Sequence, residues 1–479
     1  MLTKTFFIDL HGCAKNQVDA EILNGILCKE GWQRLDKPNF ATLIIINSCG
    51  FIEEAKKESI NSIIELKEIN PNAKIILAGC LAERYADIFA SDMKELDGVF
   101  GNGKLDQLPR LLDQIFDESA NTRTLSKRES SSYAKKKPLI KLPQTEISCG
   151  ERPEFFNFLG VAYIKITEGC DNCCSFCAIP IIRGSLRSRK IPEIVEEMKS
   201  LINRGVYEFN LVGQDLGVFG LKEKLETQPS PLSLLLREIT KLEGRFLVRL
   251  LYIHPDHFPL DILPVIVSDA RFLPYFDIPF QSGANKIIQK MNRSGSAEKY
   301  LDLLEKIREA CSSSTYKMAV IRTTFLVGFP SETDEDFNET HKFLKMSKCL
   351  WSGVFAYSKE DDTPAFSMKS QVGQKIKQKR KRILEDEQTA ITNEMLQCFV
   401  GQNFLILVEE LIEGEDEKLL IGRAWFQAPD VDGVVVASYD EAMKSIDEKT
   451  IAEGELVWVS ISKVSGFDLA GKVVLNPKN

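Results

Sequence analysis

The stretch EGCDNCCSFC, residues 168–177, decides the fold of this 479-residue chain. It directly follows an apolar segment, Tyr163–Thr167, whose pattern predicts a β-strand. Within the stretch, Cys170, Cys174 and Cys177 have the spacing CxxxCxxC. In βα barrels the loops at the C-terminal ends of the strands converge on one face, and active sites are built there. The stretch therefore predicts a barrel-like domain whose first loop carries three clustered thiols.

Three thiolates close together, without a fourth at a matching distance, suit a 4Fe–4S cluster with one iron left open. An open iron can chelate the amino and carboxylate groups of S-adenosylmethionine (SAM) and pass an electron to its sulfonium. Cys173, inside the loop, is interpreted as a bystander or a spare ligand. The alternatives are chance clustering and a structural zinc site. Zinc usually takes four Cys or His ligands in paired groups, and the four histidines of the chain supply no adjacent pair.

Strand–helix alternation continues outward from this loop, from residue 152 to about residue 400. Six strand–helix units are two short of an eight-fold barrel and predict an open, three-quarter barrel. The long helix Gln374–Gln397 is expected to end this domain. The six predicted strands are Tyr163–Thr167, Glu208–Gly213, Leu247–Ile253, Tyr275–Phe280, Ile321–Gly328 and Trp351–Tyr357.

A second cysteine triplet is spread through residues 1–117, where strands and helices also alternate. Cys13, Cys49 and Cys80 each follow a predicted strand and each lie beside a glycine, which permits close backbone approach. Because the C-terminal ends of parallel strands form one edge of a sheet, we expect the three thiols to meet. The alternative is three buried thiols near loop starts. The predicted strands are Phe6–Leu10, Thr42–Asn47 and Lys74–Gly79, with helices at Asp19–Lys29 and Glu53–Ile69.

The rest of the chain completes a prediction of three domains of the α/β class. Residues 118–151 are polar and rich in serine and lysine, and we interpret them as a linker. Residues 401–479 contain short β-rich segments with turn residues, which predict a small barrel of the OB type. The expected order is a parallel α/β domain (1–117), the linker, an open (βα)6 partial barrel (152–400) and a small β-barrel.

Composition limits the cellular setting. The formal net charge of −8 argues against non-specific affinity for nucleic acid, and no apolar run is long enough to cross a membrane. The N-terminus runs directly into a predicted strand, so we expect no secretory signal and a cytoplasmic protein without membrane partners. In a reducing compartment, grouped cysteines favour metal ligation over disulfides. The scattered Cys28, Cys311, Cys349 and Cys398 are expected to be buried and inert.

With both triplets in view, the chain resembles the methylthiotransferase family of radical SAM enzymes over nearly its whole length. The resemblance implies an N-terminal domain with an auxiliary 4Fe–4S cluster on Cys13, Cys49 and Cys80. It further implies a radical SAM barrel with a 4Fe–4S cluster on the CxxxCxxC cysteines, and a C-terminal TRAM domain. The matching segments are Gly12–Asn16, Val18–Glu21, Asn47–Phe51, Gly79–Leu81, Glu168–Cys177, Ile179–Pro180, Arg183–Gly184 and Arg322–Thr333.

The resemblance also implies the chemistry. Reductive cleavage of SAM yields a 5′-deoxyadenosyl radical that abstracts a hydrogen, and a sulfur methylated by a second SAM is transferred to the resulting carbon radical. Gly213, Gln214 and Asp215, which end the second predicted strand, are expected to contact the SAM amino group or to be ordinary turn residues. Arg322 is expected to be either a SAM ligand or part of an ion pair inside the barrel.

Two branches of the family differ in substrate. One modifies an aspartate of small-subunit ribosomal protein twelve (RimO-type) and the other modifies an adenosine in tRNA. Cys13-Ala-Lys-Asn16 and Ala428–Gly433 are similar to the RimO-type branch, whereas Gly213-Gln214 is also similar to the tRNA branch. Residues 401–479 hold 7 Lys and Arg against 15 Asp and Glu, a balance of 7 − 15 = −8. An acidic domain suits a basic ribosomal protein and makes tRNA an unlikely partner.

The favoured hypothesis is therefore a RimO-type enzyme that methylthiolates the β-carbon of an aspartate, supplied by a flavodoxin- or ferredoxin-like electron donor and a sulfur source. The alternatives are a tRNA adenosine methylthiotransferase and a non-catalytic iron–sulfur scaffold. The basic run at residues 375–382 is interpreted as a solvated helix face.

Overall fold

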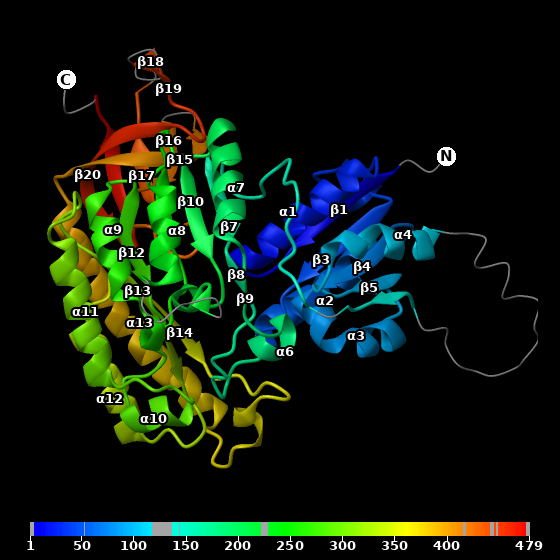
Figure 1. Ribbon diagram of the computed structural model, residues 1–479, viewed down its shortest axis with the longest axis horizontal. Coiled ribbons are helices and arrows are strands. Elements are labelled where there is room, and N and C mark those ends of the chain that lie inside the picture. The colour runs from blue at the N-terminus through cyan, green and yellow to red at the C-terminus, as the bar shows by residue number, and fades with distance from the viewer. Residues whose placement is uncertain are drawn as a thin grey trace, which may run out of the picture.

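The computed structural model describes residues 4–51, 53–116, 137–142, 144–221, 229–414, 418–440, 445–446 and 449–475. Three domains follow one another along the chain (Figure 1). The N-terminal domain, blue to cyan, lies on one side of the central barrel-like domain, drawn in green to yellow. The C-terminal barrel, in orange and red, covers one end of the central domain. The predicted order of an α/β domain, a partial barrel and a small β-barrel is confirmed.

The N-terminal domain is a six-stranded parallel sheet in the order β2-β1-β3-β4-β5-β6. Every residue of β3 is buried, because helices cover both faces of the sheet and a continuous apolar run suits such a position. The strands are β1 Thr5–Leu10, β2 Gln33–Arg34, β3 Leu43–Ser48, β4 Lys74–Gly79, β5 Gly98–Phe100 and β6 Leu139–Ile140, and the helices are α1 Ala14–Lys29, α2 Glu53–Ile69, α3 Cys80–Asp92 and α4 Leu108–Phe116.

Two features of this domain differ from the sequence-based expectation. Helix α1 begins at Ala14 rather than Asp19, and its first turns bury polar side chains that carry no apolar period. Strand β6 lies inside the segment interpreted as a linker and pairs with β5, so this part of the segment belongs to the sheet. Of the predicted linker, residues 118–136 and 143 lie outside the described residues.

The central domain contains a six-stranded parallel sheet in the order β14-β13-β12-β11-β10-β7, which confirms the six predicted strands. Apolar side chains of the sheet and its outer helices form one continuous core. The elements are β7 Val161–Lys165, β8 Thr167–Glu168, α6 Ile179–Arg183, β9 Arg187–Ser188, α7 Ile191–Asn203, β10 Glu208–Val212, α8 Pro231–Ile239, β11 Leu247–Leu250, α9 Leu263–Ser268, β12 Phe272–Asp277, α10 Asn285–Lys290, α11 Ala297–Cys311, β13 Val320–Val327, α12 Asp334–Ser347, β14 Trp351–Ala356 and α13 Gln374–Leu396.

The basic run on α13 is only partly a solvated face. Lys377 and Arg380 are buried, and Arg380 pairs with Glu332 at 2.7 Å, so the interpretation is wrong for these two residues. Helical geometry places residues three apart on one side of the helix, and this side faces the barrel. Among the described residues, no helix is both long and apolar enough to cross a membrane.

The C-terminal domain is a closed barrel with the strand order β15-β16-β17-β21-β20. It docks on the central sheet through buried charges: Arg423 Nη1 donates to both carboxylate oxygens of Glu208 at 3.1 Å. Arg322 forms an ion pair of 3.3 Å with Asp432, which favours the second of its two predicted roles. The strands are β15 Asn403–Glu413, β16 Lys418–Arg423, β17 Val435–Ser438, β20 Leu456–Ser465 and β21 Asp468–Val473, and β18 Ser445–Ile446 pairs with β19 Lys449–Thr450.

Candidate functional site

The first cysteine triplet gathers at the C-terminal edge of the N-terminal sheet. Cys13 is the N-cap of α1, Cys49 directly follows β3, and Cys80 is the first residue of α3. The neighbouring glycines allow this approach: a Cβ added to Gly12 would lie 3.2 Å from the Cβ of Cys49. A Cβ on Gly50 would lie 2.8 Å from the carbonyl of Cys80. Any larger side chain at Gly50 would therefore push the Cys49 and Cys80 loops apart.

The thiols of this triplet differ in their electrostatic surroundings. Burial raises the pKa of Cys49 to about 12, and the neighbouring Cys80 thiolate adds to the rise. Burial likewise raises the pKa of Cys80, although the Arg183 guanidinium opposes it. For Cys13 the surrounding protein also removes water, but the charges of Lys15 and Arg183 outweigh this and hold the pKa below its ordinary value. The metal-free triplet thus lacks enough positive charge to ionise all three thiols.

The second triplet lies on the loop between β8 and α6. Cys170 N donates to the Gly184 carbonyl at 3.1 Å, and Cys177 N donates to the Cys174 carbonyl at 3.0 Å, which fixes the loop as a compact turn. The Sγ of Cys174 lies 3.9 Å from Nε2 of His254. Cys173 has a positive φ of 51° and is exposed, and its carbonyl accepts from Asn292.

Burial governs the acidity of this loop as well. It raises the pKa of Cys170 to about 11 and that of Cys177 to about 12, and the Cys174 thiolate contributes to both rises. Thiolates are the form that binds iron, and bound metal provides the positive charge that ionises such thiols. The donor set of each triplet therefore suits an iron–sulfur cluster. Among the described residues, no three Cys, His, Asp or Glu side chains are arranged to hold a single metal ion.

Arg183 connects the two triplets. It ends α6, the helix that follows Cys177, and its Nη2 lies 3.2 Å from Cys80 Sγ. Its Nη1 donates to Asp19 of α1 at 2.6 Å and to Glu168 at 2.5 Å. Lys165 of β7 pairs with the same two carboxylates at 2.5 and 3.1 Å. This buried network holds the N-terminal domain against the central domain, and Cys80 packs directly on Ala178 and Ile182 of the second loop.

The three residues predicted to contact SAM lie between the triplets but have different surroundings. The carbonyl of Gly213 accepts a hydrogen bond from Lys15 Nζ at 3.0 Å. Gln214 has a side-chain amide with neither atom hydrogen-bonded, although both are buried. Asp215 is buried and already accepts four hydrogen bonds of 2.9 to 3.0 Å, from Asn172 Nδ2, Gly217 N, His254 N and His257 Nδ1.

Asp215 therefore joins the cysteine loop, through Asn172, to the loop after β11, through the two histidines. Burial opposes ionisation of its carboxyl, but the hydrogen bonds from His257 and Asn172 outweigh it and hold the pKa of Asp215 below its ordinary value. Its full set of partners makes it an organiser of the loops rather than a free ligand.

Sequence reasoning assigned no role to Lys15 or Arg183, although both fall in segments matching the family. Lys15 bonds to Gly213 and Arg183 to Cys80, each across a domain boundary, so in the sequence only their positions near Cys13 and Cys177 pointed to them.

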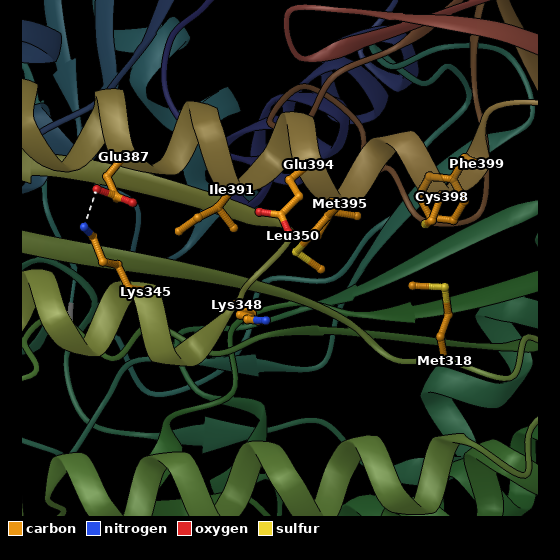
Figure 2. Close-up of a pocket in the computed structure, with 10 residues that line it drawn as sticks. All are labelled: Met318, Lys345, Lys348, Leu350, Glu387, Ile391, Glu394, Met395, Cys398 and Phe399. Carbon is orange, nitrogen blue, oxygen red and sulfur yellow. Dashed lines mark ion pairs between the residues drawn. The ribbon is translucent and has the colours of Figure 1, made fainter.

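A separate hollow of about 440 Å³ lies between α12 and α13 on the outside of the central domain (Figure 2). Glu387 and Lys345 pair across it at 3.0 Å. It contains none of the predicted site residues, and its lining residues are Met318, Lys345, Lys348, Leu350, Glu387, Ile391, Glu394, Met395, Cys398 and Phe399.

Each of the three domains matches a known family. Residues 164–344 match the radical SAM superfamily, and residues 400–474 match the TRAM domain. Residues 5–101 match a family described as uncharacterized protein family UPF0004. Among solved structures, the radical SAM methyltransferase TsrM of Kitasatospora setae is similar with a TM-score of 0.52, at 15% identity over 76% of this chain and 77% of that one. Fold and cysteine loop together define a radical SAM enzyme.

Relatives narrow this class to a family. A protein of Treponema denticola named ribosomal protein uS12 methylthiotransferase RimO is 54% identical over 98% of this chain and 100% of its own length. A relative of the same name from Petrotoga mobilis is 35% identical over 98% of this chain and 100% of its own length. Another from Aquifex aeolicus is 36% identical over 96% of this chain and 95% of its own length. The chain belongs to the RimO family of radical SAM methylthiotransferases.

Proposed function

We propose that this enzyme transfers a methylthio group to the β-carbon of an aspartate in ribosomal protein uS12. The observation that carries the proposal is the direct packing of Cys80 against Ala178 and Ile182, which follow the second cysteine loop, together with the contact of Arg183 with Cys80. A reaction that makes a carbon radical and then delivers sulfur to it needs both sites to face one substrate. The relatives named for uS12 modification support this substrate.

Each triplet is proposed to hold one 4Fe–4S cluster. Cys170, Cys174 and Cys177 would hold the cluster that binds SAM, and the triplet at 13, 49 and 80 would hold the auxiliary one. Three ligands leave one iron open at each cluster. The chemistry that these groups supply when bound is reductive cleavage of SAM at the first and delivery of a methylated sulfur at the second.

The protein's own residues would bind and orient SAM beside the first triplet. The free amide of Gln214 and the backbone of Gly213 are proposed to meet the SAM amino group, since a buried amide without partners needs a ligand. Asp215 would hold the cysteine loop against the His254 loop so that SAM finds a fixed cradle. Water exclusion by this packed interface would protect the radical from side reactions.

The partners follow from the chemistry. The excess of acidic residues in the C-terminal domain, −8 over residues 401–479, complements a basic ribosomal protein and disfavours tRNA. Reduction of the cluster requires a one-electron donor such as flavodoxin or ferredoxin, and each methylthio group requires a sulfur source. We place the reaction in the cytoplasm, where ribosomal proteins are made.

Mass spectrometry of uS12 and of total tRNA nucleosides, from cells with and without the gene, tests the substrate. Loss of the methylthio increment on uS12 with unchanged tRNA is the expected result. Loss of methylthioadenosine from tRNA instead would reject the proposal in favour of the other branch.

Two triple variants test the division of labour in reconstituted protein with dithionite. The first variant, with Ala at Cys170, Cys174 and Cys177, should form no 5′-deoxyadenosine. The second variant, with Ala at Cys13, Cys49 and Cys80, should still form 5′-deoxyadenosine but should not methylthiolate uS12. The second variant should contain about half of the wild-type iron. The matched control is a variant with Ala at 28, 311 and 398, cysteines outside both triplets, which should keep both activities.

A further inference from the structure

Lys15 brings a buried ammonium from the N-terminal domain into the space between the two triplets. It lies two residues after Cys13 and is only 8% exposed. Its Nζ donates to the carbonyl of Gly213 at 3.0 Å, at the end of β10. The same Nζ lies 4.1 Å from the ring centroid of Tyr252, which follows β11. Lys15 therefore reaches the face of the central sheet where the reaction is proposed.

Lys15 has no directly paired carboxylate among the described residues, whereas Lys165 pairs with both Asp19 and Glu168. Its charge acts on the Asp277 carboxyl and the Cys13 thiol without an ion pair to that carboxyl. An ammonium has three donors, and the Gly213 carbonyl takes one of them. Burial of a cation without a directly paired counter-ion is costly, so its retention at this position needs a reason.

Two neighbours indicate that the surroundings of Lys15 are built for a ligand. Tyr252 has a φ of +68°, a conformation that a non-glycine residue keeps only when its environment enforces it. The result is a ring placed under the ammonium, where a cation–π contact holds the charge in position. Gln214, which follows Gly213, has a buried amide without a hydrogen-bond partner that we assign to SAM. The Lys15 ammonium, bound to the Gly213 carbonyl, therefore lies next to the proposed cofactor site.

We propose that the Lys15 ammonium binds the side-chain carboxylate of the substrate aspartate. The inference rests on the proposed function and names the group that recognises its substrate. A carboxylate would supply the missing counter-ion and use the free N–H donors of Lys15. The β-carbon of aspartate is bonded to the carboxylate carbon, so holding the carboxylate fixes the reacting carbon one bond away. A neutral nucleobase can accept a hydrogen bond but offers no full negative charge to pair with the ammonium, which makes Lys15 a determinant of specificity.

The test combines a change in the enzyme with one in the substrate. Fluorescence anisotropy measures binding of labelled uS12, with Asp or Asn at the modified position, to the holoenzyme with SAM and without reductant. For the wild type, Asn should weaken binding about 10- to 100-fold, the range for a charged hydrogen bond. Lys15→Met should weaken binding of the Asp form by a similar factor and bind both forms equally. Iron content, the visible spectrum and SAM affinity should stay unchanged.

Lys377 provides a matched control. It is a buried lysine whose Nζ donates to the Tyr357 carbonyl at 2.7 Å, lies 4.7 Å from a tyrosine ring, and has no carboxylate partner among the described residues. Lys377→Met removes the same kind of contacts on α13 and should retain the preference for the Asp form.

Each other outcome overturns the inference in a recognisable way. If Lys15→Met keeps the wild-type preference for Asp, the ammonium does not bind the carboxylate. If Lys15→Met no longer binds SAM, the ammonium belongs to the cofactor site. The same conclusion follows if the variant no longer forms 5′-deoxyadenosine in the absence of uS12. If wild-type enzyme fails to methylthiolate uS12 at all, the proposed function itself is wrong, and the wild type alone reveals this.

Discussion

The guanidinium Nη2 of Arg183 lies 3.2 Å from the Sγ of Cys80, although the two residues are 103 positions apart in the chain. Arg183 ends the short helix that follows the second cysteine loop, and Cys80 begins a helix of the N-terminal domain. One buried side chain therefore ties the helix after the second cysteine loop to a cysteine of the first triplet. Its other partners, Asp19 and Glu168, belong to different domains, so the contact is part of the interface that assembles the site.

The first prediction concerns the stability of this interface. Arg183→Met should lower the free energy of unfolding by about 3–5 kcal/mol, because Asp19 and Glu168 lose a buried partner. Urea denaturation of metal-free protein, followed by tryptophan fluorescence, measures the change. Lys241→Met removes an exposed ion pair with Glu238 and should cost less than about 1 kcal/mol. Equal losses in the two variants would show that Arg183 does not stabilise the interface.

The second prediction concerns docking of the C-terminal barrel. Arg423 is buried between Glu208 of β10 and Glu409 of β15 and pairs with both. Arg423→Met removes the cation that pairs with Glu409 and leaves Glu208 with the more distant Arg249, at 3.6 Å, so the docked state should lose about 3–5 kcal/mol. Limited proteolysis should then cut near residue 401 sooner than in the wild type. Lys472→Met, which removes an exposed pair with Asp440, should leave the cleavage rate unchanged.

The strands and the cysteine positions could be predicted from the sequence because buried parallel strands appear as continuous apolar runs. Strand β4, Lys74–Gly79, was predicted with its observed limits, and each cysteine of the first triplet lies just after a predicted strand. Local patterns carry this information, since a strand end and the residue after it are adjacent in the chain.

What the sequence could not provide are contacts whose partners are distant. The start of α1 was missed because its inward face is polar, with Asn16, Asp19 and Glu21 buried against the central domain. Hydrophobic periodicity detects an apolar core and is blind to a buried ionic interface. Strand β6 is two residues long and is defined by its pairing with the edge strand β5. The role of Asp215 as a loop organiser depends on partners up to 43 positions away.

A third prediction concerns pH. Burial raises the pKa of Asp277 from 3.8 to about 6, although the nearby Arg322 opposes the rise. Between pH 3.8 and about pH 6, Asp277 is protonated in the folded protein and ionised in the unfolded chain. Its contribution to the stability of the folded state therefore increases as the pH falls from about 7 to about 4. At pH 8 its buried charge costs about 3 kcal/mol, from a shift of about two units at 1.36 kcal/mol each.

Asp277→Asn should remove this cost. Urea midpoints of the wild type and the variant should differ most at pH 8, with the variant more stable, and should converge near pH 4. A constant difference between the two proteins from pH 5 to pH 8 would show that Asp277 titrates normally in the folded state.

The last prediction concerns the thiols themselves. In metal-free protein the surrounding protein disfavours the Cys13 thiolate by removing water, but the charges of Lys15 and Arg183 outweigh this and lower the pKa of Cys13. Burial raises the pKa of Cys177 and of the inert Cys311 to about 12. Thiolates are the reactive form, so iodoacetamide at pH 7 should alkylate Cys13 at least about ten times faster than the other two. Peptide mass spectrometry measures the three rates.

Reconstitution with iron and sulfide should reverse this order, since a thiolate bound to iron is no longer free to attack the reagent. Cys13 and the other five proposed ligands should then be protected. Cys28 and Cys398 are exposed, so the expectation of buried thiols is wrong for these two, and they should continue to react at their former rates. In metal-free Arg183→Met, labelling of Cys13 should slow because one of the two cations that stabilise its thiolate is gone. Protection of Cys28 or continued labelling of Cys13 after reconstitution would contradict the assignment of ligands, because the six proposed thiols alone should lose their reactivity.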